Sequence, residues 1–166
     1  MTTRFLVDNC LTTRLATVAR EAGYEAMHLR DLKLENRNDW DLMPIIRDGA
    51  WTLVTRNARD FRGPEHAPGT KGQYRRLSEH NGLVCLNGPP DELDIRMQQE
   101  LFRAVLAHLR NPATDPRGDD LAGQVVEATI EKSEDLVIHL RRYDLPVGAW
   151  DAEETTFISE RNRLGR

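Results

Sequence analysis

The sequence predicts an α/β fold of three layers, in which helices cover both faces of a mainly parallel sheet. In the first half of the chain, short apolar runs alternate with segments whose apolar residues recur at helical spacing. Apolar runs without polar alternation are typical of buried parallel strands joined by helical crossovers. A C-terminal helix and a β-hairpin extension complete the predicted fold. We expect residues 1–110 to form the α/β domain and residues 111–166 to form the hairpin extension and a flexible tail.

Four apolar runs predict strands of a sheet that we expect to have four or five strands, and the runs lie at residues 4–7, 24–30, 51–54 and 82–86. Between the first two, Thr12 or Thr13 is expected to begin a helix that ends at Gly23. A second helix is expected over residues 38–49, where Asn38, Asp39 or Asp41 is the candidate first residue. Each strand is therefore separated from the next by a segment long enough for a crossover.

The middle and the end of the chain carry further signals. Residues 62–70 are rich in glycine and proline and predict a loop, and residues 71–80 predict a short helix. A long helix is expected to begin near Asp91, after a glycine and two prolines. Its apolar stripe consists of Leu101, Phe102, Val105, Leu106 and Leu109. The stripe either packs on its own domain or forms part of an interface, with Trp150 as a candidate anchor.

Composition limits the classes of function. The chain has 166 residues, which favours one domain with a substantial core. It contains no apolar run of 18 residues, and a strand follows the first residues directly, so we expect neither a membrane span nor a signal peptide. Cys10 and Cys85 are far apart in sequence, so two thiols in a reducing cytoplasm are favoured over one disulfide. Residues 1–86 carry 13 Lys and Arg against 11 Asp and Glu, whereas residues 87–166 carry 10 against 16. Neither part has the basic stripe of a high-affinity nucleic-acid binder.

Three acidic residues lie where the chain is expected to change direction. Asp8 follows the first strand, Asp39 precedes the second helix, and Asp60 follows the third strand. Because ligands gather at the carboxyl ends of parallel strands, these acids are expected to converge there. Carboxylates that converge favour Mg²⁺ or Mn²⁺, since hard cations prefer oxygen ligands. The five histidines show no zinc-binding spacing.

Each acid also has a purely structural interpretation. Asp8 is a possible helix cap, Asp39 is favourable at a helix N-terminus, and Asp60 is a possible turn residue. The functional hypothesis depends on their occurring together.

Three motifs together resemble the PIN-like domains of the VapC-like type II toxin ribonucleases, over roughly residues 4–88. They are the segment Leu6-Val7-Asp8-Asn9, residues 38–55 with Asp39, and Thr55-Arg56-Asn57-Ala58-Arg59-Asp60-Phe61. The resemblance implies an endoribonuclease that uses Mg²⁺ or Mn²⁺, acts in the cytoplasm and is neutralised by an antitoxin, and a homodimer is possible. No residue matches the glutamate that many PIN domains have after the first helix.

Carried over by position, the resemblance implies a role for six residues. Asp8, Asp39 and Asp60 become metal ligands and catalytic residues, Asn57 becomes catalytic and shapes the strand-end loop with Thr55, and Arg56 contacts phosphate. Because Arg59 and Arg62 follow Arg56 closely, all three are candidate substrate-binding residues that position RNA phosphates, and the alternative is a solvated basic loop. Trp40 or Tyr74 is a candidate for stacking on bases. The alternative function is a non-catalytic PIN-like module that binds a protein partner, because three acids are few for a two-metal site.

Overall fold

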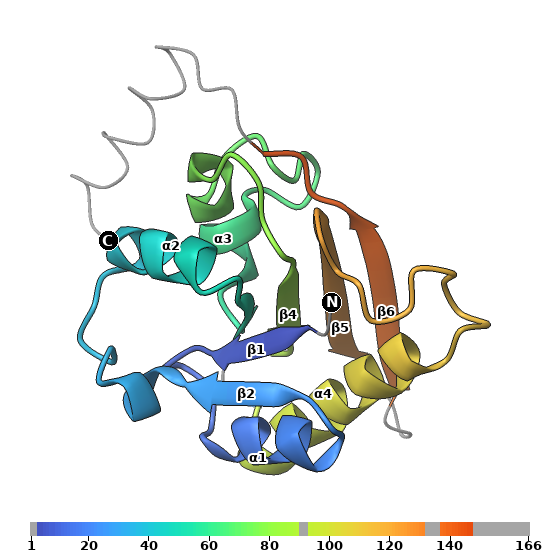
Figure 1. Ribbon diagram of the computed structural model, residues 1–166. Coiled ribbons are helices and arrows are strands. Elements are labelled where there is room, and N and C mark those ends of the chain that lie inside the picture. Colours follow the sequence, from blue (N-terminus) through green and yellow to red (C-terminus); the bar gives the residue numbers. More distant parts are fainter. Residues whose placement is uncertain (1–2, 90–92, 132–136, 148–166) are drawn as a thin grey trace.

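Six strands, rather than the expected four or five, form one continuous sheet in the computed structural model, which describes residues 3–89, 93–131 and 137–147 (Figure 1). The sheet order is β2-β1-β3-β4-β5-β6. The strands are β1 (Arg4–Val7), β2 (Glu25–His28), β3 (Thr52–Thr55), β4 (Leu83–Asn87), β5 (Gln124–Glu131) and β6 (Val137–Asp144). Strands β1 to β5 pair in parallel, and β6 pairs antiparallel with β5.

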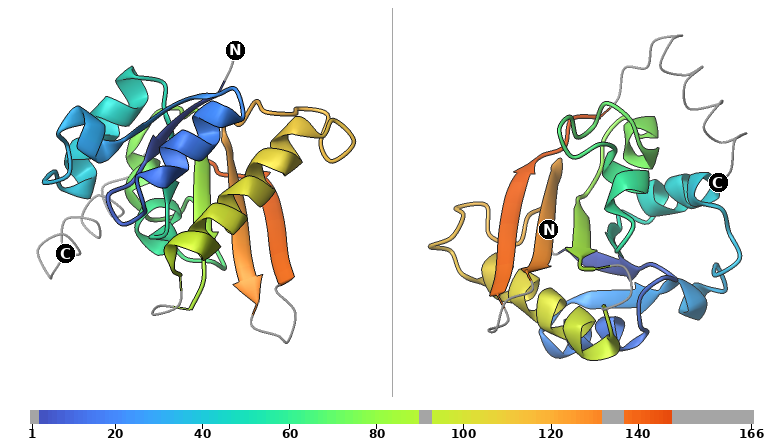
Figure 2. Two further views of the ribbon diagram at one scale, coloured as in Figure 1. Left: turned by 90° about the horizontal axis from the view of Figure 1, so that it is seen from below. Right: turned by 180° about the vertical axis from the view of Figure 1, so that it is seen from behind.

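Helices lie on both faces of this sheet, so the predicted three-layer α/β fold is confirmed (Figure 2). The helices are α1 (Arg14–Glu21), α2 (Asp39–Asp48), α3 (Ala58–Arg62) and α4 (Ile95–Arg110), with the 3₁₀ turns η1 (Leu29–Leu32) and η2 (Gln73–Arg76). One face packs against α1 and α4, and the other packs against α2, α3 and η2. Within the described residues, every helix is too short or too polar to cross a lipid bilayer.

The two faces of the sheet bury two separate apolar clusters because successive strand residues point in opposite directions. On the α1 and α4 face, the Phe5 ring packs edge-on against Tyr24 and Phe102, with centroids 5.3 and 5.4 Å apart. The stripe of α4 belongs to this cluster, and each of its five residues is at most 4% exposed. The stripe therefore packs on its own domain, and its interpretation as an interface was wrong.

Several element boundaries differ from the prediction. Helix α4 begins at Ile95, because the Asp94 carboxylate caps it by accepting from Met97 N at 2.8 Å. The helix expected over residues 71–80 is reduced to the single turn η2. There, the buried Tyr74 hydroxyl donates to Gly82 O at 2.8 Å and holds the segment against the start of β4.

The predicted hairpin is present, and it continues the main sheet, since β5 pairs with β4 from Leu83↔Val125 to Asn87↔Thr129. Residues 124–131 therefore share the sheet with the first part of the chain. The expected tail and Trp150 lie outside the described residues, as do residues 132–136.

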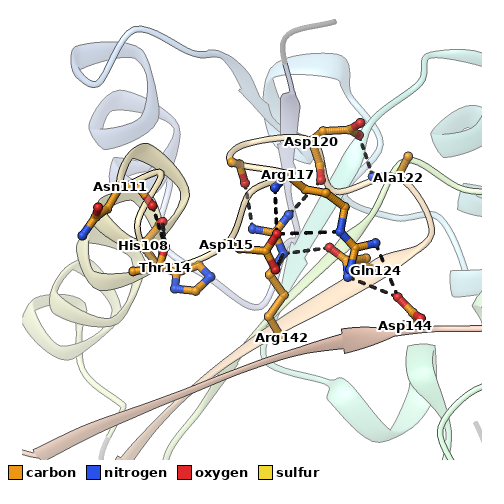
Figure 3. Close-up of polar contacts among 11 residues, drawn as sticks. His108, Asn111, Thr114, Asp115, Arg117, Asp120, Ala122, Gln124, Arg142 and Asp144 are labelled. Carbon is orange, nitrogen blue, oxygen red and sulfur yellow. Dashed lines mark hydrogen bonds and ion pairs between the residues drawn. The ribbon is translucent and has the colours of Figure 1, made fainter.

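A polar cluster fixes the loop between α4 and β5 to the hairpin (Figure 3). The Arg142 guanidinium donates to Gln124 Oε1 at 2.7 Å, to Gly118 O at 2.7 Å and to Asp120 O at 2.9 Å. Asp115 lies 3.7 Å from the same guanidinium. Arg142 pairs with Val126 near the amino end of β5. This cluster therefore lies at the sheet edge opposite to the carboxyl ends of β1 and β3.

Candidate functional site

Asp8 lies immediately after β1, at the carboxyl edge of the sheet, and is 6% exposed. Its backbone N–H donates to Val54 O at 2.9 Å, which extends the pairing of β1 with β3 by one residue. Its Oδ1 accepts from Asn9 N at 2.8 Å, and its Oδ2 accepts from the Thr55 hydroxyl at 2.7 Å. These hydrogen bonds hold a buried carboxylate in one orientation.

Thr55 connects Asp8 to the loop that follows β3. Its side chain is fully buried, and its Oγ1 both donates to Asp8 and accepts from Asn57 N at 3.0 Å. One hydroxyl therefore fixes the positions of a carboxylate from β1 and of the backbone that begins α3. Only the second of these roles was expected for Thr55 from the sequence.

Cys10 also contacts this carboxylate. Its thiol donates to Asp8 Oδ2 at 3.5 Å and lies 3.8 Å from Thr55 Oγ1. Burial, together with the negative charge of Asp8, raises the pKa of the Cys10 thiol to about 12. The thiol is therefore protonated at neutral pH and acts here as a hydrogen-bond donor. Both cysteines are free, as predicted, although Cys10 is only half-buried whereas Cys85 is fully buried.

The orientation of α2 places Asp39 toward the same carboxyl edge of the sheet. The C-terminus of α2 leads through Gly49 directly into β3, so its N-terminus lies toward the carboxyl end of that strand. Ten helical residues rise about 15 Å and four strand residues about 13 Å, so α2 is long enough to run back along the whole length of β3. Asp39 is the first residue of α2, after Asn38, and is half-buried.

The segment after β3 carries the other residues selected from the sequence. Asn57 is exposed and precedes α3, a short helix that the sequence analysis did not expect. Asp60 is half-buried within α3, and its backbone N–H donates to Asn57 O at 3.0 Å. Arg56 is half-buried and Arg59 is exposed. All four follow β3, which is the neighbour of β1, so they lie at the edge that carries Asp8.

Arg62 has a different environment from the other two arginines. It is 7% exposed and forms an ion pair with Glu127 of β5, with Nε to Oε2 at 3.0 Å and Nη2 to Oε1 at 3.2 Å. Its Nη1 donates to Gly63 O at 2.6 Å. Burial disfavours the Glu127 charge, but hydrogen bonds from Arg62, Tyr143 and Asn87 outweigh it and hold the pKa of Glu127 below its usual value. In this arrangement the charge of Arg62 is compensated inside the protein.

Glu35 is an acid that the sequence analysis did not select. It lies in the loop between η1 and α2, and its backbone carbonyl accepts from Asn9 Nδ2 at 3.4 Å. Its Oε2 is buried and has no hydrogen-bond partner among the residues that the structure describes. Only its position in the sequence could have indicated Glu35 as a site residue. The loop follows β2 and therefore starts at the carboxyl edge of the sheet, where Asp8 also lies.

The carboxylates of this edge do not form a closed metal cage in the structure. Among the described residues, no three His, Cys, Asp or Glu side chains are close enough together to hold a metal ion. The donors at the edge are carboxylate oxygens, which suit Mg²⁺ or Mn²⁺, and Mg²⁺ commonly uses one or two carboxylates and several waters. The residues present therefore fit an ion with few protein ligands. The metal-ligand roles of Asp8, Asp39 and Asp60 stay predictions.

The two aromatic candidates for base stacking differ in exposure. Tyr74 is fully buried, so its stacking role was wrong. Trp40 is half-buried in the first turn of α2. The sequence could not distinguish them, because an isolated aromatic residue in a polar segment carries no periodic signal of burial.

Comparison with known proteins identifies the class of the chain. Residues 3–68 match the model of a family described as PIN like domain, which spans β1 to the loop after α3. The chain belongs to the PIN-like domain family, whose members are generally nucleases that use divalent metals.

The chain is also similar to a curated bacterial protein. The uncharacterized protein y4eN of Sinorhizobium fredii (strain NBRC 101917 / NGR234) is 52% identical over 88 residues, which cover 52% of this chain and 85% of the relative. No solved structure matches the chain.

Proposed function

We propose that this protein is a Mg²⁺- or Mn²⁺-dependent endoribonuclease that hydrolyses RNA phosphodiester bonds. The observation that carries the proposal is the orientation of the buried Asp8 carboxylate by Thr55, at the carboxyl edge of a PIN-like sheet. A buried carboxylate is costly unless hydrogen bonds or a cation compensate it. Asp8 is thus prepared to hold a cation at a defined position.

In the proposed site, Asp8 would hold the ion, Asp39 and Asp60 would reach it by a change of side-chain rotamer, and water would complete the coordination. When bound, such an ion lowers the pKa of its water and neutralises charge that develops on the phosphate. Thr55 keeps the Asp8 carboxylate in place, and Asn57 holds the loop that begins α3. Arg59 is exposed at the same edge, where it would position the RNA backbone together with Arg56.

The biological role that we propose is a toxin of a type II toxin–antitoxin pair, acting in the cytoplasm as a monomer or a homodimer. The resemblance of the three motifs to VapC-like toxins supports it. The test is co-expression with the product of the neighbouring gene, followed by purification and an RNA cleavage assay. A stable complex with suppressed cleavage is expected, and the absence of any complex would argue against the toxin role while leaving the nuclease proposal intact.

One observation favours the alternative of a non-catalytic PIN-like protein-interaction module. The described acids form no group of three at metal-binding distance. Titration with Mn²⁺ separates the two functions, because a nuclease site binds Mn²⁺ saturably and loses that binding in Asp8→Asn. If the wild-type protein shows no saturable binding and no Mn²⁺-dependent cleavage, the interaction module is the correct function. Glu35→Gln belongs in the same titration, because its buried oxygen is a further candidate ligand.

A further inference from the structure

A small pocket lies at the carboxyl ends of β4 and β5, on the same face of the sheet as Asp8. Its volume is about 220 Å³, and it is lined by Arg62, Glu65, Asn87, Glu127, Thr129 and Arg141. We propose that this pocket binds a nucleobase of single-stranded RNA whose backbone passes Asp8. The proposal rests on the proposed function, since it extends that site along the sheet edge.

The register of the sheet places the pocket in line with the candidate site. In the register of neighbouring strands, Thr55 is paired with Cys85, Cys85 with Glu127, and Glu127 with Arg141. Asp8 is level with Thr55, one residue beyond the pair Val7↔Val54. Asp8 and Glu127 are thus three strands apart, which corresponds to about 14 Å at the usual spacing between strands. A short stretch of extended single strand covers this distance.

The walls of the pocket are held rigid by the buried ion pair. Glu127 Oε1 accepts from Arg62 and from Asn87 Nδ2 at 2.9 Å, and Glu127 Oε2 accepts from Arg62 and the Tyr143 hydroxyl. Both oxygens of Glu127 are therefore engaged within the protein. A pre-ordered wall lowers the entropy cost of binding, so the pocket is suited to a ligand group of fixed shape.

The charges of the pocket favour a neutral ligand group over a phosphate. The positive charge of Arg62 is compensated by Glu127, and the lining also contains one further cation, Arg141, and one further anion, Glu65. A phosphate would need an excess of positive charge, which this lining does not supply. A nucleobase is neutral and planar, and it presents hydrogen-bonding edges.

Arg141 and Asn87 supply the contacts that a base requires. The Arg141 guanidinium lies 4.8 Å from the centroid of the Tyr143 ring, and the residue is exposed. Guanidinium planes stack on unpaired bases in RNA complexes. The Asn87 amide donates to Glu127 and to Thr129 Oγ1 at 3.2 Å, so its orientation is fixed. Its Oδ1 has no hydrogen bond to a described residue and is available to a base edge.

The test uses the full-length Asp8→Asn protein, so that RNA is bound without being cut. Fluorescence anisotropy measures binding of labelled hexanucleotides of A, C, G or U at one fixed salt concentration. Arg141→Ala and Arg141→Lys are each expected to weaken binding about tenfold, because both remove the stacking plane. Asn87→Ala is expected to reduce the differences among the four sequences. The matched control is Arg103→Ala, an exposed arginine of α4 on the opposite face of the sheet.

The outcomes separate this proposal from the proposed function. If Arg141→Lys binds as tightly as the parent, the contact is electrostatic and the base pocket is wrong. Unchanged binding in both Arg141→Ala and Asn87→Ala also overturns it, whatever the nuclease activity. If the wild-type protein cleaves no RNA but hexanucleotide binding depends on Arg141 as expected, the pocket stands and the nuclease function fails. If no hexanucleotide binds, both fail.

Discussion

The Thr55 hydroxyl of β3 donates a hydrogen bond of 2.7 Å to the Asp8 carboxylate at the end of β1. Both residues are buried, and the same hydroxyl accepts from Asn57 N. Two motifs that are 47 positions apart in sequence therefore meet through one atom.

Thr55→Val removes the hydroxyl and keeps the shape of the side chain. We expect it to lower the free energy of unfolding by about 1–3 kcal/mol, because a buried acceptor and a backbone donor lose their partner. RNA cleavage should fall as well, since Asp8 is no longer held in place. Thr55→Ser retains the hydroxyl and is the control. Equal stability of the valine and serine variants in urea titrations would contradict the bridging role.

Asp8→Asn, Asp39→Asn and Asp60→Asn are each expected to lower metal-dependent RNA cleavage by at least about a hundredfold, a loss of about 2.7 kcal/mol or more in transition-state stabilisation. Their thermal unfolding temperatures should stay close to that of the wild type, because removing one of several neighbouring negative charges relieves repulsion. Cleavage rates over a range of Mn²⁺ concentrations check the first part, and thermal scans check the second. A fully active Asp60→Asn protein would remove Asp60 from the site.

The reactivity of Cys10 tests the electrostatics of the same carboxylate. Burial and then the Asp8 charge raise the pKa of this thiol to about 12, so native protein at pH 8 should react with a thiol-specific reagent far more slowly than unfolded protein. Asp8→Asn removes the charge and should speed the reaction of Cys10. The buried Cys85 provides the internal reference, and peptide mapping of the labelled protein separates the two sites.

The buried pair of Arg62 and Glu127 should contribute to stability. Glu127→Gln leaves the Arg62 charge buried without its partner and is expected to cost about 3–5 kcal/mol. Asp48→Asn breaks the exposed ion pair with Arg47 and should leave the free energy of unfolding unchanged within error. Urea unfolding of both variants provides the comparison, and a Glu127→Gln protein as stable as the wild type would show that the pair contributes nothing.

The pH dependence of stability follows from the same pair. The pKa of Glu127 is lower in the folded protein than its ordinary value of 4.5. Below pH 4.5, Glu127 of the unfolded chain therefore binds a proton that folded Glu127 does not. The contribution of ionised Glu127 to the free energy of unfolding is present above this pH and is lost as the pH falls through the pKa of the folded state. Urea midpoints measured from pH 7 to pH 3 should decrease at the acid end, and less steeply in Glu127→Gln. Parallel acid limbs in the two proteins would contradict this assignment.

The sequence by itself determined the order of strands and helices over residues 4–55 and the places where the chain turns. Apolar runs and helical spacing are local signals, and the burial of β1, β3 and β4 follows from them. The positions of Asp8 and Thr55 at strand ends also follow, since each is the polar residue at which an apolar run stops. The apolar stripe of α4 was recognised in the same way, although not the surface on which it packs.

Only the tertiary structure decided which polar residues meet. Arg62 and Glu127 are 65 positions apart in sequence, and their ion pair depends on β5 joining the sheet in parallel beside β4. The burial of Tyr74 and the direction of the Cys10 thiol toward Asp8 likewise depend on neighbours from distant segments. Local propensity sets the periodicity of an element, whereas the partner of a side chain is set by strand order and register. Strand order and register cannot be predicted from local sequence patterns, because they are defined only when the whole sheet is assembled.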